Sequence, residues 1–545
     1  MIPMLRAPRR FAFVLVLAVL AGPIAAPARE LPSPKEAWIE LHVWDFTLYS
    51  NAGESKARAI GQDLERLRDA LAQLFPGQVL SSPVPTSIFV FKDFFSFQPY
   101  VRSYDPQVVD KGGYFLSRQL GNYVAISADQ NGQERELVFH EYVHYLLRNN
   151  AATLPLWLHE GLAEYYSTFE AGRAEARVGL PPAGHAQWLR QHELVPLTRI
   201  FAVDERSPEY NEWSRGGAFY AESWLLVHYL ISGNPDRRRQ AGELLRLAQA
   251  GTPPDRLLTA AFGADPATLE AELRPYVKKY VFYSTRLPLR PAANPATTAR
   301  PMAWPEVLSR LGDLLGNLAD DHLALAAEHF RAALAAQPGQ ASALAGLGQL
   351  AERAGHPDEA RSFYEQAAPL APADPTVQYL LARSLLASPG PDSLTRARAA
   401  LQKAVALRPD FGEAWASLGY TYQVEESLSA EAVTSLEAAH RLLPFRMDVA
   451  HNLALAYART GQEQKAGELI ERMLLLGAGA EEIEGAREAL IDEEQRRAEE
   501  LIDENRTAEA VTLLEAARAK TASPARREAI AVRLEELRRQ QSVNP

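Results

Sequence analysis

The chain of 545 residues contains no cysteine, which excludes disulfides and thiolate metal sites. Any metal ion would have to be held by histidine and carboxylate side chains. Basic residues are also in the minority, with 57 Lys and Arg against 68 Asp and Glu and a formal net charge of −11. This balance predicts no nucleic-acid partner and no attraction to an anionic membrane.

Apolar runs long enough to cross a membrane are missing as well. An uncharged run over residues 11–22 is shorter than the ~18 residues that a spanning helix needs. It follows three arginines and precedes Ala26-Pro27-Ala28, which is the order of a cleavable secretory signal. We therefore expect a signal peptide over residues 1–28, no membrane span after its removal, and an exported bacterial protein, periplasmic or secreted. Removal of Arg6, Arg9 and Arg10 with the signal changes the formal net charge from −11 to −14. The alternative to a cleaved signal is an uncleaved membrane anchor over the same residues.

Hydrophobic patterning predicts mixed α and β structure in the first part of the chain. A helix is expected over residues 61–74. Strand-like runs are expected over residues 38–48, 86–91, 114–116 and 122–127. Everything after Glu134 has helical composition. We expect one domain over residues 29–287, mixed to about residue 133 and helical over residues 134–287.

A second region follows five prolines between residues 288 and 305, which predict an extended linker. Beyond it, prolines recur at intervals of 34, 37 and 35 residues, at Pro338, Pro372, Pro409 and Pro444. The segment from Trp415 to Tyr422 matches the Trp-x2-Leu-Gly-x2-Tyr signature of tetratricopeptide repeats. Residues 306–545 therefore resemble a tetratricopeptide-repeat array, an all-α solenoid with C-terminal capping helices, and the resemblance implies a protein partner on its surface.

The segment His140-Glu141-Tyr142-Val143-His144 carries the strongest chemical signal. Residues 134–148 lack proline and glycine, and on a helix His140 and His144 lie one turn apart on the same face. Two imidazoles can then meet one metal ion, while Glu141 can act as general base toward a metal-activated water.

The next segment, Trp157-Leu158-His159-Glu160-Gly161, resembles the second zinc helix of the gluzincin peptidases in their aminopeptidase-like branch. The resemblance implies Zn²⁺ as the cofactor, Glu160 as the third ligand, and Glu164 as a carboxylate that hydrogen-bonds a zinc histidine, here His140. Fifteen residues separate His144 from Glu160, against about eighteen in that branch, and nineteen separate it from Glu164. An exchange of roles between Glu160 and Glu164 is therefore the alternative.

The same resemblance implies a tyrosine that stabilises the oxyanion of the transition state. Tyr220, in the segment from residue 215 to 224, fills that role, with His228 or a plain core tyrosine as alternatives. Residues 122–127 are expected to be the edge strand that binds the substrate backbone, with an ordinary structural strand as the alternative. The remaining candidates are expected to be solvated or satisfied polar residues instead of ligands: His159, His185 and His192.

Over residues 38–283 the chain is similar to bacterial peptidase-MA-like domains, which are often fused to tetratricopeptide repeats. The fold expected is an α+β zincin-like metallopeptidase domain followed by an all-α tetratricopeptide-repeat solenoid, acting on a peptide or protein substrate. A Gly-x-Met-Glu-Asn segment is missing before His140, which favours an endopeptidase or a specialised substrate; hydrolysis of another bond stays open. The competing hypothesis is a non-catalytic exported scaffold, in which the repeats bind partners and the zinc domain is vestigial. Intact His140, Glu141, His144 and Glu160 argue against it.

Overall fold

The computed structural model describes residues 31–543 with internal gaps at 44–45, 75–83, 102–111, 130–132, 151–153, 173, 205, 212–216, 250–251, 253, 264, 280–281, 290–297, 389, 426–428 and 477–478. The expected signal peptide, residues 1–28, lies outside the described residues. In the part of the chain that is described, none of the helices is both long enough and apolar enough to cross a membrane.

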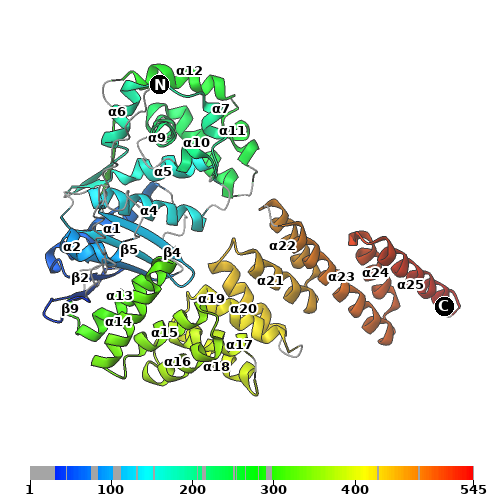
Figure 1. Ribbon diagram of the computed structural model, residues 1–545. Coiled ribbons are helices and arrows are strands. Elements are labelled where there is room, and N and C mark those ends of the chain that lie inside the picture. The colour runs from blue at the N-terminus through cyan, green and yellow to red at the C-terminus, as the bar shows by residue number, and fades with distance from the viewer. Residues whose placement is uncertain are drawn as a thin grey trace, which may run out of the picture.

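A six-stranded mixed sheet forms the centre of the N-terminal half (Figure 1). Its order is β4-β5-β3-β2-β1-β9, where β2, β3 and β5 run parallel and the other strands are antiparallel to their neighbours. The strands are β1 (Ile39–Val43), β2 (Phe46–Ser50), β3 (Thr86–Phe91), β4 (Gly113–Arg118), β5 (Gly121–Ser127) and β9 (Arg300–Pro301). The hydrophobic patterning predicted β3, β4 and β5. The single run expected over residues 38–48 is two antiparallel strands, β1 and β2, and β9 was not expected.

The two faces of this sheet bury different kinds of side chain. Because successive residues of a strand point to opposite faces, Ile88 and Val90 of β3 pack into one core while Phe89 and Phe91 pack into another. The aliphatic face is covered by α1 (Glu54–Leu74) and α4 (Gln133–Asn150). The aromatic face is covered by the short helices α2 (Phe94–Phe97) and η1 (Gln98–Tyr100). The first helices of the C-terminal half, α13 (Trp304–Leu318) and α14 (Leu323–Ala336), cover the same face (Figure 1).

The chain after Glu134 is not helical throughout, so that expectation was wrong in three places. A second sheet of three strands, in the order β6-β7-β8, joins β6 (Glu170–Ala171), β7 (Glu175–Val178) and β8 (Thr285–Pro288). These strands have two to four residues, too few for an alternating pattern to stand out. The helices around them are α5 (Leu156–Ser167), α6 (Ala183–Gln191), α7 (Leu197–Phe201), α8 (Pro208–Asn211), α9 (Ala218–His228), α10 (Pro235–Gln249), α11 (Pro254–Phe262) and α12 (Pro266–Val277).

The C-terminal half is an array of helix pairs that runs away from the sheet (Figure 1). Small residues let the helices approach closely: the Phe330 ring lies against both Gly312 and Gly346, at sites where a Cβ would not fit. After α13 and α14 the helices are α15 (Ala341–Arg353), α16 (Pro357–Leu370), α17 (Pro375–Ala387), α18 (Ser393–Leu407), α19 (Gly412–Gln423), α20 (Ser429–Leu442), α21 (Met447–Arg459), α22 (Glu463–Leu475), α23 (Ala480–Asp503), α24 (Thr507–Lys520) and α25 (Pro524–Val543). We call residues 304–543 the repeat array.

The repeat array is joined to the sheet by more than the expected linker over residues 288–305. Part of that segment, residues 290–297, lies outside the described residues, but Arg300–Pro301 pairs with β1 as an additional strand. Buried hydrogen bonds cross the same junction: His329 Nε2 lies 3.1 Å from the Tyr100 hydroxyl, and His322 Nε2 lies 3.0 Å from the Val101 carbonyl oxygen. The first helix pair of the array therefore shares a core with the sheet.

Candidate metal centre

Helix α4 carries the two histidines because its other side chains fix its orientation. Val138, Phe139, Tyr142 and Val143 are buried in the core that α4 shares with the aliphatic face of the sheet and with α5. His140 and His144, at i and i+4, therefore share one face of α4, and their side chains are buried as well. The imidazole Nε2 atoms lie 2.8 Å apart.

Glu160 on α5 brings a carboxylate to the same point. Its Oε2 atom lies 3.2 Å from His144 Nε2 and 3.5 Å from His140 Nε2, and all three residues are buried. A tetrahedral zinc ion with ligands at about 2.1 Å separates its ligand atoms by about 3.4 Å, so the two nitrogen–carboxylate distances fit such an ion. The two imidazole nitrogens, 2.8 Å apart, lie closer together than such an ion would hold them. Two nitrogens and one carboxylate oxygen also leave a fourth position, as a catalytic zinc site requires.

The protonation state of Glu160 suits a metal ligand. Burial alone would favour the neutral acid, but the two imidazoles beside it outweigh burial and hold the pKa of this carboxyl well below its usual range. Glu160 is therefore an anion inside the core. A buried anion needs a cation or hydrogen-bond donors around it, and a dication at this point would meet that need.

Behind the three ligand candidates, Glu164 contacts His140 from the far side. One turn after Glu160 on α5, its Oε1 atom lies 3.3 Å from His140 Nδ1, so the carboxylate can fix the tautomer that leaves Nε2 free to bind a metal. Its other oxygen, Oε2, lies 3.1 Å from Nε2 of His185 on α6. The structure thus places Glu160 at the convergence point and Glu164 behind it, in the order that the resemblance implies.

Two of the three histidines that are not expected to be ligands lie beside the cluster of His140, His144 and Glu160. His185 is buried against Glu164, although its nitrogens lack the alignment of a hydrogen bond with any described residue. Half-buried His159 stacks on His144, with ring centroids 4.5 Å apart and planes inclined by 9°. No spacing motif links either residue to His140, so the sequence offered no signal for them. His192 is exposed and stacks on Trp188.

The general-base candidate and the oxyanion candidates lie on different helices. Glu141 is half-buried on α4, next to His140. Tyr220 on α9 is buried, and its hydroxyl donates a hydrogen bond to the Tyr210 carbonyl oxygen at 3.2 Å. His228 is buried among aromatic rings, with Nδ1 2.7 Å from the Tyr276 hydroxyl, and burial lowers its pKa to about 4. His228 is therefore a core residue that is hydrogen-bonded at Nδ1.

The predicted substrate-binding edge was assigned to the wrong strand. Residues 122–127 belong to β5, which pairs with β4 on one side and with β3 on the other, so β5 has no free edge. Strand order depends on tertiary pairing, which the hairpin pattern alone did not reveal. Within the described residues the edge strand on this side is β4, which also packs against α4.

The model of the family described as tetratricopeptide repeat matches residues 317–384. The C-terminal array contains a tetratricopeptide-repeat region. No curated protein matches the chain.

Three of the solved structures that are similar to the chain are the following. YrrB, described as a TPR protein with an unusual peptide-binding site, is 22% identical, with 33% of this chain and 90% of YrrB covered and a TM-score of 0.29. The pilF protein of Pseudomonas aeruginosa is 19% identical over 42% of this chain and 97% of its own, with a TM-score of 0.29. A thermophilic TPR protein of Thermus thermophilus, TTC0263, is 21% identical over 36% of this chain and 98% of its own, with a TM-score of 0.23. Tetratricopeptide repeats bind protein partners, which is the function that the repeat region supports.

Proposed function

We propose that the chain is a zinc-dependent hydrolase of peptide bonds, whose tetratricopeptide-repeat region binds protein partners. The observation that carries this proposal is the convergence of His140 Nε2, His144 Nε2 and Glu160 Oε2, with Glu164 behind His140. A zinc ion held there would supply Lewis acidity, polarising a carbonyl group and lowering the pKa of a water molecule.

Glu141 is the residue proposed to move the proton. It follows His140 on α4 and is half-buried, so it lies at the rim of the ligand cluster instead of within it. In this role its carboxylate takes the proton of the attacking water and later delivers that proton to the departing amine. A carboxylate so placed contributes about 10²–10⁴ in rate.

Tyr220 is the residue proposed to donate a hydrogen bond to the oxyanion. Tyr220, Ser223 and Val227 share one face of α9 because they are spaced by three and seven residues. Ser223 and Val227 on that face approach Gly161 so closely that a Cβ at Gly161 would lie 2.5 Å from the Ser223 carbonyl oxygen. Gly161 directly follows Glu160 on α5. The close approach of α9 to Gly161 therefore supports a position of Tyr220 on the side of α9 that faces α5.

Edge strand β4 is the proposed partner of the substrate backbone. A chain paired with β4 would add a strand to the sheet beside α4, where the Phe115 ring of β4 meets the Tyr145 ring next to His144, with centroids 6.3 Å apart. This mode of binding suits an internal segment of an extended polypeptide. The exported location predicted from residues 1–28 would place such a substrate outside the cytoplasm.

A second candidate function is a non-catalytic scaffold, and the comparisons favour it because they match the repeat region. In that case the tetratricopeptide repeats bind their partner and the metal centre, if loaded, is structural. The two candidates make different predictions for Glu141, because a general base contributes to turnover and not to metal retention.

The deciding experiment compares wild-type protein with Glu141→Gln and with Glu136→Gln, a matched change of an exposed glutamate on the same helix. Zinc content is measured by elemental mass spectrometry and hydrolysis with a library of quenched fluorescent peptides. The peptidase proposal expects about one zinc per chain in all three proteins and at least a 100-fold loss of hydrolysis in Glu141→Gln alone. Bound zinc without any wild-type hydrolysis would favour the scaffold, and folded protein that retains no zinc would refute the assignment of the site.

A further inference from the structure

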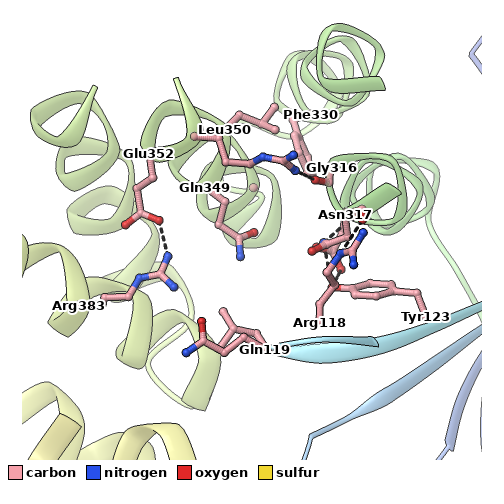
Figure 2. A pocket seen from close by; sticks show the side chains of 14 residues that line it. Arg118, Gln119, Tyr123, Gly316, Asn317, Phe330, Gln349, Leu350, Glu352 and Arg383 are labelled. Atoms are coloured by element: carbon pink, nitrogen blue, oxygen red, sulfur yellow. Dashed lines mark hydrogen bonds and ion pairs between the residues drawn. The ribbon is translucent and has the colours of Figure 1, made fainter. Parts of the chain in front are cut away.

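A cavity of about 210 Å³ lies between the β4–β5 hairpin and the first helices of the repeat array. Figure 2 shows Arg118 and Gln119 of the hairpin on one side, and Asn317, Gln349 and Arg383 of the array around the rest of the space. These three array residues come from α13, α15 and α17. The cavity is therefore built jointly by the N-terminal sheet and by the tetratricopeptide-repeat region.

The walls of this cavity are fixed in place. Arg118 Nε donates to the Asn317 carbonyl oxygen at 2.9 Å, and the same guanidinium reaches the Leu318 carbonyl oxygen at 3.3 Å. Leu120, at the tip of the hairpin, packs against apolar clusters of the array. Across the cavity Arg383 pairs with Glu352 (Figure 2). The hairpin thus rests on the array, and a ligand would meet a preformed site.

Strand β4 leads from the metal centre to this cavity. Phe115, in the middle of β4, contacts Tyr145 beside His144, and Arg118, the last residue of β4, lines the cavity. Three residues of an extended strand span about 10 Å. A polypeptide that pairs with β4 near the metal centre would reach the cavity after three or four residues.

The pairing pattern of β4 leaves outward-facing backbone groups along that path. The Ser127 amide donates to the Gly112 carbonyl oxygen, and hydrogen-bonded pairs alternate along an antiparallel ladder. Gly113, Phe115 and Ser117 therefore turn their backbone groups away from β5. No other described strand covers this edge. Antiparallel pairing is the more stable mode, and it would place the amino-terminal side of the bound chain at the Arg118 end.

The chemistry of the cavity suits a polypeptide backbone. The carboxamides of Gln119 and Gln349 point into the space from opposite sides in Figure 2, and each offers both a donor and an acceptor. The arginines that line it are engaged with backbone carbonyls or with Glu352, so the site carries no large excess of one charge. These carboxamides can donate to and accept from the peptide units of a bound chain.

We infer that this cavity binds the amino-terminal continuation of an extended substrate chain that pairs with β4. The inference rests on the proposed function and narrows its substrate class to unfolded polypeptides that extend at least about four residues before the cleaved bond. Short peptides lack the residues that reach the cavity and so lose this contribution to binding.

The test uses the full-length protein and two matched tryptophan variants. Gln349→Trp fills the cavity from α15, whereas Gln366→Trp places the same side chain on the exposed surface of α16. Quenched peptides spanning the first site cleaved in β-casein are extended by four residues on the amino-terminal or the carboxy-terminal side. We expect the amino-terminal extension to raise kcat/KM at least 10-fold in wild type and in Gln366→Trp, and to have no effect in Gln349→Trp. Equal gains from both extensions, or a gain that survives Gln349→Trp, would overturn the inference.

A binding measurement separates this inference from the proposed function. Fluorescence anisotropy of labelled β-casein is followed with the same proteins in the Glu141→Gln background. If no protein cleaves any peptide, casein binding that Gln349→Trp weakens at least 10-fold still supports the cavity, although the peptidase proposal has failed. Casein binding unchanged by Gln349→Trp refutes the cavity in either case. Should Gln349→Trp fold poorly, Gln119→Trp fills the space from the exposed hairpin tip and replaces it.

Discussion

Gly161 gives the most direct test of how α5, the helix that carries Glu160 and Glu164, packs against α9. A Cβ at this position would lie 2.5 Å from the Ser223 carbonyl oxygen and 2.6 Å from Val227 Cγ2, both on α9. Carbon–oxygen contacts are normally about 3.3 Å or longer, so Gly161→Ala must separate α5 from α9 by about 0.8 Å. Overpacking of this kind costs about 1–3 kcal/mol, and a backbone atom cannot rotate away, which puts the cost near the upper end. Alanine recovers about 1 kcal/mol through its helix propensity, leaving a net loss of about 2 kcal/mol.

Thermal unfolding followed by tryptophan fluorescence measures this loss, because Trp157 of α5 and Trp224 of α9 are both fully buried. A loss of about 2 kcal/mol predicts a fall in Tm of about 4–8 °C for a domain of this size. Gly242→Ala is the matched control: Gly242 lies in helix α10 with nothing within 4 Å of its ideal Cβ, so there we expect Tm to rise by about 2–4 °C. A Gly161→Ala protein that melts at or above the wild-type temperature would refute the close approach of α5 and α9.

Two further predictions concern buried carboxylates. Glu164→Gln removes the anion beside His140 Nδ1, so we expect the zinc affinity to fall about 10–100-fold. Competition with a chromogenic chelator measures this affinity. The control variant Glu170→Gln, on the exposed strand β6, should leave the zinc affinity unchanged. Burial, with the nearby charge of Glu270, raises the pKa of Glu222 to about 8 even though the Val195 amide donates to it. Between pH 4.5 and 8 the folded chain then holds a proton that the unfolded chain has released, so this group lowers stability as pH rises through that window. Glu222→Gln cannot titrate, and its Tm relative to wild type should increase from about pH 5 to about pH 8; a pH-independent difference would contradict the assignment.

Local periodicity explains most of what the sequence predicted. The helical repeat alone puts His140 and His144 on one face of α4, and short β-branched and aromatic runs are enough to indicate β3 and β5. The placement of Glu160 and Glu164 came instead from a family resemblance, because no local rule brings α5 against α4. His185 and His159 were out of reach for the same reason, since their partners Glu164 and His144 are met only through the packing of helices.

The contact between the sheet and the repeat array was also missed, although the sequence held a signal for it. Residues 88–91 of β3 are apolar without interruption, a pattern typical of a strand covered on both faces. The long helices α1 and α4 cover only the aliphatic face of the sheet, and α13 and α14 supply most of the cover on the other face. The proline-rich composition before Pro305 predicted a linker. The strand within this segment, Arg300–Pro301, is only two residues long and pairs at the edge of the sheet, where proline is tolerated.

This shared core bears on the choice between the two candidate functions. A scaffold that merely displays repeats could carry them on a flexible linker. Here α13 packs on the aromatic face of β3, while α4 packs on the aliphatic face of the same sheet. The distance between the cluster of His140, His144 and Glu160 and the repeat array is therefore fixed through β3. Arg118 ties the end of edge strand β4 to α13 at the same junction. A fixed distance matters when one polypeptide must occupy both sites at once, which is what the proposed peptidase would require of a substrate positioned by the repeats.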